Sequence, residues 1–192
     1  FSVTFLINNG AGELSTRIDV ATPGRTKDLA ILAGGRVAMS VENVGVLIGS
    51  GLTEWGFMHT VAYVVPAGGG LTVGDVDANG GTDVVVAAPG LPGHSISVLY
   101  ANGFDFTPVT YPVPGSSPTK ITVADVTADG RLDIAYIDPY VNTLGVLENL
   151  GNRSFFVHPL RNTLQTPTGL EVGDFNRDGL DDVMISTTND DQ

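Results

Sequence analysis

The sequence predicts an all-β fold, a β-propeller of four four-stranded blades, and three observations point to it. Glycine and proline punctuate the chain with 25 and 11 copies, so segments long enough for ordinary helices cannot recur. An acidic motif repeats along the chain, its leading residues Asp75, Asp125 and Asp174 lying 50 and 49 residues apart. Each interval has room for four short antiparallel strands, which is the size of one propeller blade.

Composition narrows the class further. With 192 residues, 21 acidic against 9 basic side chains and a net charge of −12, the chain suits one domain that repels phosphate backbones, so we expect no nucleic-acid partner. The absence of cysteine excludes disulfides, thiolate metal sites and cysteine nucleophiles. No apolar run approaches the roughly 18–20 residues of a membrane span, so no membrane insertion is expected. The chain begins at Phe1 without a signal-like segment, and we expect a processed or excised piece.

Each repeat begins with a strand, an acidic loop and a second strand. The three clear copies are Leu71–Val86, Ile121–Tyr136 and Leu170–Ile185. A fourth, degenerate copy is predicted over residues 18–31, with its loop at residues 21–27. The strand after each loop is nearly all apolar, which predicts cover on both faces, as between neighbouring blades. These strands are Val84–Ala88, Ile134–Ile137, Val183–Ile185 and, in the degenerate copy, Leu29–Ala33. A two-sheet sandwich is the alternative fold.

The second half of each unit reads as two strands around a tight turn of residues that tolerate positive φ. The predicted turns are Asn9-Gly10, Gly49-Ser-Gly51, Asn102-Gly103 and Gly151-Asn152. The single domain 1–192 then divides into a second half-blade (1–20), a degenerate-loop blade (21–65), two acidic-loop blades (66–113 and 114–160) and a first half-blade (161–192). The terminal halves together make a fourth blade. The chain can close on itself, exchange halves with a second chain in an eight-bladed ring, grow as a filament, or be a stretch of a longer propeller.

The acidic loops carry the chemistry. Oxygen-bearing residues occupy positions 1, 3, 5 and 9, glycine at position 6 permits a sharp bend, and the carbonyl of position 7 can close a shell of six to eight oxygens. The loops therefore predict about three structural Ca²⁺ ions, although Asp and Asn also cap turns without metal. An EF-hand is excluded, because its position-12 Glu is missing and the flanks are strands. The first acidic loop supplies Asp75, Asp77, Asn79, Gly81 and Asp83; the second Asp125, Thr127, Asp129, Arg131 and Asp133; the third Asp174, Asn176, Asp178, Leu180 and Asp182. The degenerate copy keeps only Asp19 and Asp28.

Nothing in the sequence assembles a catalytic site, and we expect no enzyme. The three histidines stand apart from one another, and no spacing brings two of the carboxylates Asp105, Asp138 and Glu148 together for glycoside chemistry. Four aromatic residues can stack on sugars or, as the more frequent role, fill blade cores: Trp55, Tyr63, Tyr111 and Tyr140. Asn152-Arg-Ser matches a glycosylation sequon.

The segment from Val172 to Asp182, together with the Val-Leu-x-x-Asn-Gly pattern at Val98–Gly103, resembles the FG-GAP/VCBS repeats of bacterial surface proteins and of the integrin α-chain propeller. The resemblance implies a propeller with structural loop Ca²⁺ ions, a secreted or cell-surface location, and roles in adhesion or carbohydrate binding. Thr127 departs from the family's acid or amide at position 3, and four blades are fewer than the usual seven or eight.

The resulting expectation is a non-catalytic, calcium-binding extracellular repeat protein for adhesion, binding of a glycan or surface protein, or assembly. A fibre or surface-layer subunit that self-associates through its terminal half-blades is one alternative. An accessory propeller of a secreted hydrolase or lyase is another.

Overall fold

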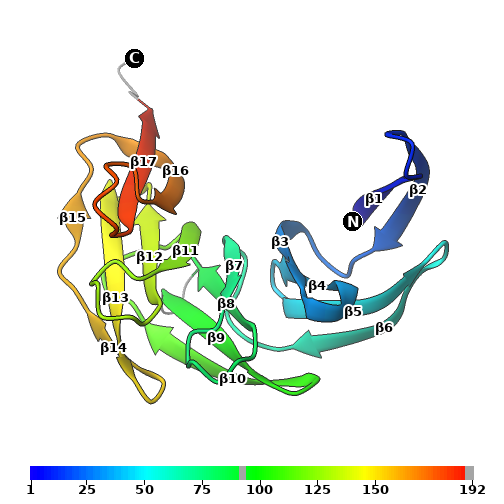
Figure 1. Ribbon diagram of the computed structural model, residues 1–192, viewed down its shortest axis with the longest axis horizontal. Coiled ribbons are helices and arrows are strands. Elements are labelled where there is room, and N and C mark those ends of the chain that lie inside the picture. The colour runs from blue at the N-terminus through cyan, green and yellow to red at the C-terminus, as the bar shows by residue number, and fades with distance from the viewer. Residues whose placement is uncertain (91–93, 189–192) are drawn as a thin grey trace.

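The computed structural model describes residues 1–90 and 94–188, and within these ranges the chain folds into strands, turns and one short 3₁₀ segment (Figure 1). The last four residues of the predicted terminal half-blade lie outside the described ranges. All sheets are small and antiparallel, and the larger ones hold four or five strands, as propeller blades do. The all-β prediction is confirmed. None of the described residues form a helix with the length and hydrophobicity needed to span a bilayer.

The sheets follow one another along the chain. We name them the N-terminal half-blade, blades 1 to 3 and the C-terminal half-blade. The N-terminal half-blade holds β1 (Ser2–Asn8) and β2 (Leu14–Ala21). Blade 1 holds β3 (Thr26–Leu32), the 3₁₀ segment η1 (Ala33–Gly35), β4 (Arg36–Val41), β5 (Gly45–Thr53) and β6 (Gly56–Tyr63). Blade 2 holds β7 (Leu71–Gly74), β8 (Asp83–Ala88), β9 (Ser95–Asn102) and β10 (Asp105–Pro112).

Blade 3 holds β11 (Lys120–Ala124), β12 (Asp133–Asp138), β13 (Thr143–Gly151) and β14 (Ser154–Val157), with the short β15 (Arg161–Asn162) also pairing with β13. The C-terminal half-blade holds β16 (Thr166–Gly173) and β17 (Asp182–Thr188). Figure 1 shows the sheets along an open arc, with the two half-blades at its opposite ends. The predicted fourth blade is therefore present as two separate halves, which do not pair with each other in this structure.

The core lies between the blades. One apolar cluster joins blade 2 to blade 3 and contains Val85, Tyr100 and Tyr136; another joins blade 1 to blade 2 and contains Val46 and Val84. Strands β8 and β12 are buried along their whole length because a sheet covers each face. This agrees with the prediction for their continuous apolar runs. The prediction does not hold for the apolar run Val183–Ile185. This run lies in β17, which is largely exposed because no described sheet follows it along the arc.

The degenerate copy was placed in the wrong register. Residues 22–25 connect β2 of the N-terminal half-blade to β3, the first strand of blade 1. The segment Leu29–Ala33 lies largely in β3, where Leu29 and Ile31 are exposed. The strand covered on both faces is β4, whose entry is the short η1 turn with left-handed Gly34 and Gly35. No acidic residues mark this tight connection, and the continuous apolar run Leu29–Ala33 wrongly predicted the buried strand.

The predicted turn at Gly49-Ser-Gly51 is also wrong. These residues lie inside β5, and the hairpin to β6 turns at Glu54-Trp55, three residues after Gly51. A Cβ atom at Gly49 would lie 2.4 Å from the Phe57 ring, so Gly49 is small in order to let that ring pack across the strand pair. The glycine reports close packing there rather than a bend.

Candidate metal centre

The three acidic loops share one backbone conformation. Each connects the first to the second strand of its sheet, and each has left-handed φ angles at positions 4 and 6: Ala78 and Gly80, Ala128 and Gly130, Arg177 and Gly179. The aspartate at position 1 accepts hydrogen bonds from the amides of positions 5 and 6. For Asp75 these are Asn79 N at 3.0 Å and Gly80 N at 2.9 Å. The same pair of bonds recurs at Asp125 and at Asp174. Position 1 therefore caps the turn, and the loop forms from its own sequence.

The aspartate at position 9 anchors the loop to the sheet. Asp83 begins β8 and is fully buried, and it accepts hydrogen bonds from Val76 N in the loop at 2.8 Å and from Ala101 N in β9 at 2.7 Å. Asp133 does the same in the second acidic loop, with Thr127 N and Asn149 N. Burial raises the pKa of Asp83, the two amides oppose that rise, and the nearby charge of Asp77 adds to it. A cation close by would favour the ionised form of this buried carboxylate.

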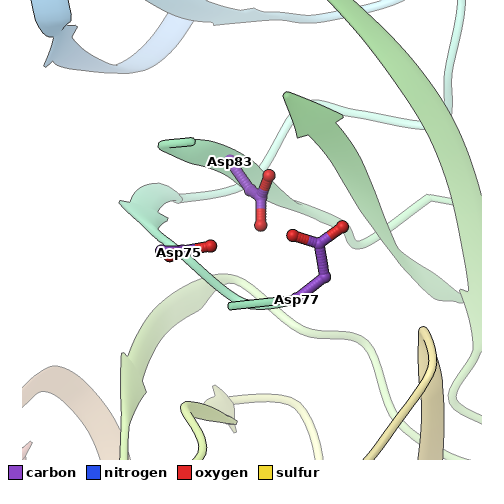
Figure 2. Close-up of side chains that lie close together, drawn as sticks. All are labelled: Asp75, Asp77 and Asp83. Atoms are coloured by element: carbon purple, nitrogen blue, oxygen red, sulfur yellow. The ribbon is translucent and has the colours of Figure 1, made fainter. Parts of the chain in front are cut away.

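Asp75, Asp77 and Asp83 come together in the first acidic loop. One oxygen atom of each carboxylate lies within 4.8 Å of those of the other two, and the three side chains point toward a common centre (Figure 2). The Asp77 side chain is only 9% exposed. Its Oδ2 accepts hydrogen bonds from Arg153 Nε at 3.0 Å and Nη2 at 2.8 Å, whereas its Oδ1 is buried without a hydrogen-bond partner. The guanidinium of Arg153 bonds only one of the three carboxylates, so the cluster favours a further positive charge, and the Oδ1 of Asp77 is available to coordinate a cation.

The other predicted ligands of this loop lie beside the triad. Asn79 Oδ1 accepts a hydrogen bond from Gly81 N at 2.6 Å, and its Nδ2 donates to Ala101 O in β9 at 3.2 Å. A Cβ atom at Gly81 would lie 2.8 Å from that of Ala101, so a glycine is needed for the loop to approach β9. A metal role for Asn79 and for the Gly81 carbonyl stays a prediction.

The second acidic loop already contains a positive charge. The guanidinium of Arg131 contacts the Asp129 carboxylate, and its Nε donates to Asn149 O at 2.6 Å. The hydroxyl of Thr127 donates to Asp133 at 3.0 Å, and its role as a metal ligand stays a prediction.

The third acidic loop is exposed. Asp178 accepts hydrogen bonds from Asn176 Nδ2 at 3.0 Å and Leu180 N at 2.9 Å, and Asp182 accepts from Phe175 N at 3.0 Å. Over residues 1–90 and 94–188, only the first acidic loop gathers three carboxylates at the distance given above. The expected number of three ions therefore stays a prediction.

Arg153 was not anticipated from the sequence. It lies in the β13–β14 turn of blade 3, yet it bonds Asp77 in blade 2 and its guanidinium carbon lies 4.3 Å from the centre of the Tyr100 ring. Its own carbonyl accepts a hydrogen bond from Tyr111 Oη at 2.7 Å. No feature of the loop repeat signals this contact, because it crosses from one repeat to the next. Arg153 thus ties the candidate metal centre to the neighbouring blade.

The remaining candidates lie apart from the triad. Asp105 accepts a hydrogen bond from Tyr63, Glu148 contacts His158 at 2.8 Å, and the buried Asp138 accepts from the amide of Ser117. Each carboxylate thus has its own partner. Tyr63 and Tyr111 make edge-on ring contacts with Phe106 and Phe155, whereas Trp55 and Tyr140 are exposed. Asn152 is exposed in a hairpin turn, and its glycosylation stays a prediction.

Comparison with known proteins agrees with this repeat geometry. The sequence pattern of the FG-GAP-like repeat family matches residues 75–136 and 125–185, each match running from one acidic loop through the next and on into the strand that follows it. Together the matches cover more than half of the chain. No curated protein matches it. The acidic loops, the blade-like sheets and this match identify the chain as a member of the FG-GAP-like repeat family.

Proposed function

We propose that this protein is a non-catalytic, calcium-binding repeat protein of a secreted or cell-surface setting, which holds its blades in a fixed array to bind a glycan or a surface protein. The Asp77 carboxylate carries the proposal, because it lies within 4.8 Å of those of Asp75 and Asp83 and its Oδ1 is buried without a hydrogen-bond partner. A buried carboxylate oxygen without a hydrogen-bond partner is costly, and a bound cation removes that cost.

The oxygen ligands of the first acidic loop favour Ca²⁺. The triad supplies hard carboxylate oxygens, and the Gly81 carbonyl and the Asn79 side chain add neutral oxygens from the same loop. Ca²⁺ accepts six to eight such ligands in irregular geometry, whereas Mg²⁺ requires a near-ideal octahedron and keeps its water. Members of FG-GAP repeat families commonly bind Ca²⁺, which also favours this ion.

The ion acts structurally. Bound at Asp75, Asp77 and Asp83, it joins the loop to β8, and through Arg153 and Ala101 it fixes the contacts with blade 3 and with β9. Blades held in this way present their loops in constant positions. The exposed rings of Trp55 and Tyr140 are candidate platforms for sugars or for a protein partner.

A thermal-unfolding series tests the metal role. The melting temperature should rise by several degrees in excess Ca²⁺ and much less in Mg²⁺, and a chelator should reverse the rise. Asp77→Asn should remove most of this response, whereas Asp19→Asn, in β2 away from the acidic loops, should keep it. Equal melting curves in Ca²⁺ and chelator would refute a structural ion.

A binding screen against glycans and surface proteins tests the proposed ligand binding. Trp55→Ala and Tyr140→Ala should weaken retention of a bound glycan without changing the melting temperature, because both rings are exposed. Hydrolysis or elimination of any retained glycan would contradict the non-catalytic assignment.

A further inference from the structure

In the described part of the chain, each half-blade has a strand with one edge that pairs with no other strand. In blades 2 and 3 the second strand pairs with the third, as β8 does with β9 and β12 with β13. By its place after an acidic loop β17 is a second strand, and by its place before an Asn-Gly turn β1 is a third strand. Each is paired on one side only, β17 with β16 and β1 with β2. We propose that β17 pairs with β1 of a second copy of this chain and so completes a blade between two molecules.

The complete blades fix the register of this pairing. Val84 faces Leu99 and Ile134 faces Leu147, each beginning one residue after the position-9 aspartate. The corresponding residue of β17 is Val183. Alignment of Asn9-Gly10 with Asn102-Gly103 makes Leu6 the counterpart of Leu99. Val183 therefore pairs with Leu6, and because the strands run antiparallel, Thr187 pairs with Ser2.

Exposed apolar side chains mark the faces that the new blade would bury. Met184 is 52% exposed, whereas its counterpart in blade 2, Val85, is fully buried in the cluster between blades 2 and 3. Leu6 is 53% exposed, whereas Leu99 is fully buried between blades 1 and 2. Both side chains thus lie at positions that a completed blade removes from water.

Asp182 lacks the cross-strand partner that its counterparts have. Asp83 and Asp133 each accept a hydrogen bond from an amide of the third strand, at Ala101 and Asn149 respectively. In the described part of the chain Asp182 accepts only from Phe175 N and Asn176 N, both within its own loop. The register given above brings Asn8 N of the second copy to this aspartate. Strand pairing would therefore also order the third acidic loop.

The geometry favours a second copy over closure within one chain. β1 and β17 lie far apart at opposite ends of the arc in Figure 1, and a separation seen in one view is a minimum for the true separation. Two copies placed head to tail would pair β17 of each with β1 of the other, so that each of these strands would have a partner on both sides.

A disulfide trap tests the pairing directly, because the natural chain has no cysteine. Ser2→Cys combined with Thr187→Cys places the two thiols opposite each other on one face of the predicted pair, and oxidation should give a covalent species of twice the 20.0 kDa chain mass. Ser2→Cys with Ser186→Cys is the matched control, since the Ser186 side chain lies on the other face and should trap at least tenfold less.

Light scattering on the natural chain completes the test. Leu6→Glu should shift the mass from two chains to one, whereas Phe104→Glu, in the exposed turn of blade 2, should leave it unchanged. A monomeric natural chain, an intrachain disulfide in the trap, or equal trapping of both cysteine pairs would overturn the proposal.

Discussion

The first and third acidic loops share a backbone but differ in their surroundings. In each loop the position-1 aspartate, Asp75 or Asp174, accepts a hydrogen bond from a loop amide and caps the turn. The position-9 aspartate, Asp83 or Asp182, also accepts a hydrogen bond from an amide of its loop. The first loop is covered by β9 of its own sheet and by the Arg153 turn of the next blade. The third lies on a two-stranded sheet and is exposed. The loop conformation is therefore local, whereas the burial of the first loop comes from neighbouring strands. The two loops also differ at position 3, where the first has Asp77 and the third has Asn176.

This difference predicts unequal effects of removing position 9. Asp83→Ala should lower the free energy of unfolding by about 3 kcal/mol, because it leaves the buried amides of Val76 and Ala101 without an acceptor. Asp182→Ala should cost less than about 1 kcal/mol, since water can replace the bonds of an exposed loop. Urea unfolding in excess Ca²⁺ measures both. Equal losses would show that the two loops have the same environment in solution.

The contact that the third loop lacks can be tested at Arg153. Arg153→Lys should lower the free energy of unfolding by about 1–2 kcal/mol, because lysine keeps the charge but loses the paired bonds to Asp77 and the stacking on Tyr100. Arg17→Lys is the control: its ion pair with Asp19 is exposed, so the substitution should have little effect on stability. Urea unfolding should separate the two variants, and equal effects would mean that the link between blades 2 and 3 contributes nothing.

The loops and strands that recur in each repeat could be predicted from the sequence, whereas the contacts between neighbouring repeats could not. The period of the acidic loops placed β7, β8, β11, β12, β16 and β17, because each loop folds through bonds within nine residues. The entry to β4 was missed, since η1 carries no acid and glycine alone does not distinguish a turn from close packing, as Gly49 shows. Arg153 and the exposure of Met184 were not predictable from any single repeat. Both depend on which sheet lies next along the arc.

The second acidic loop extends the comparison to Ca²⁺ affinity, because Arg131 places a positive charge beside its carboxylates. Arg131→Leu gives this loop the residue that the third loop has at position 7 and removes the guanidinium from Asp129. The affinity of the second loop for Ca²⁺ should rise roughly three- to tenfold, because a competing positive charge leaves and the backbone carbonyl stays. Titration calorimetry measures the change. An unchanged affinity would show that the Arg131 side chain moves aside when the ion binds.

The smallest expected effect on stability concerns a hydrogen bond between blades 1 and 2. Tyr63 of β6 donates a hydrogen bond to Asp105 of β10 at 2.5 Å. Burial, and then the bond and charge of Asp105, raise the pKa of Tyr63 to about 12. Because the phenol is neutral in the folded chain up to that pKa while the unfolded chain loses its proton near pH 10, stability should fall as pH rises from about 10 to 12.

After allowance for solvent screening, the loss attributable to Tyr63 should be at most about 1 kcal/mol. Tyr63→Phe removes the ionisable group, so the variant should be less stable than the natural chain at neutral pH and should lose less stability between pH 10 and 12. The difference between their two pH profiles isolates this contact from the other tyrosines. Parallel profiles would show that the bond to Asp105 does not hold blade 1 against blade 2, and the fixed array of blades would then depend on the apolar cluster between them.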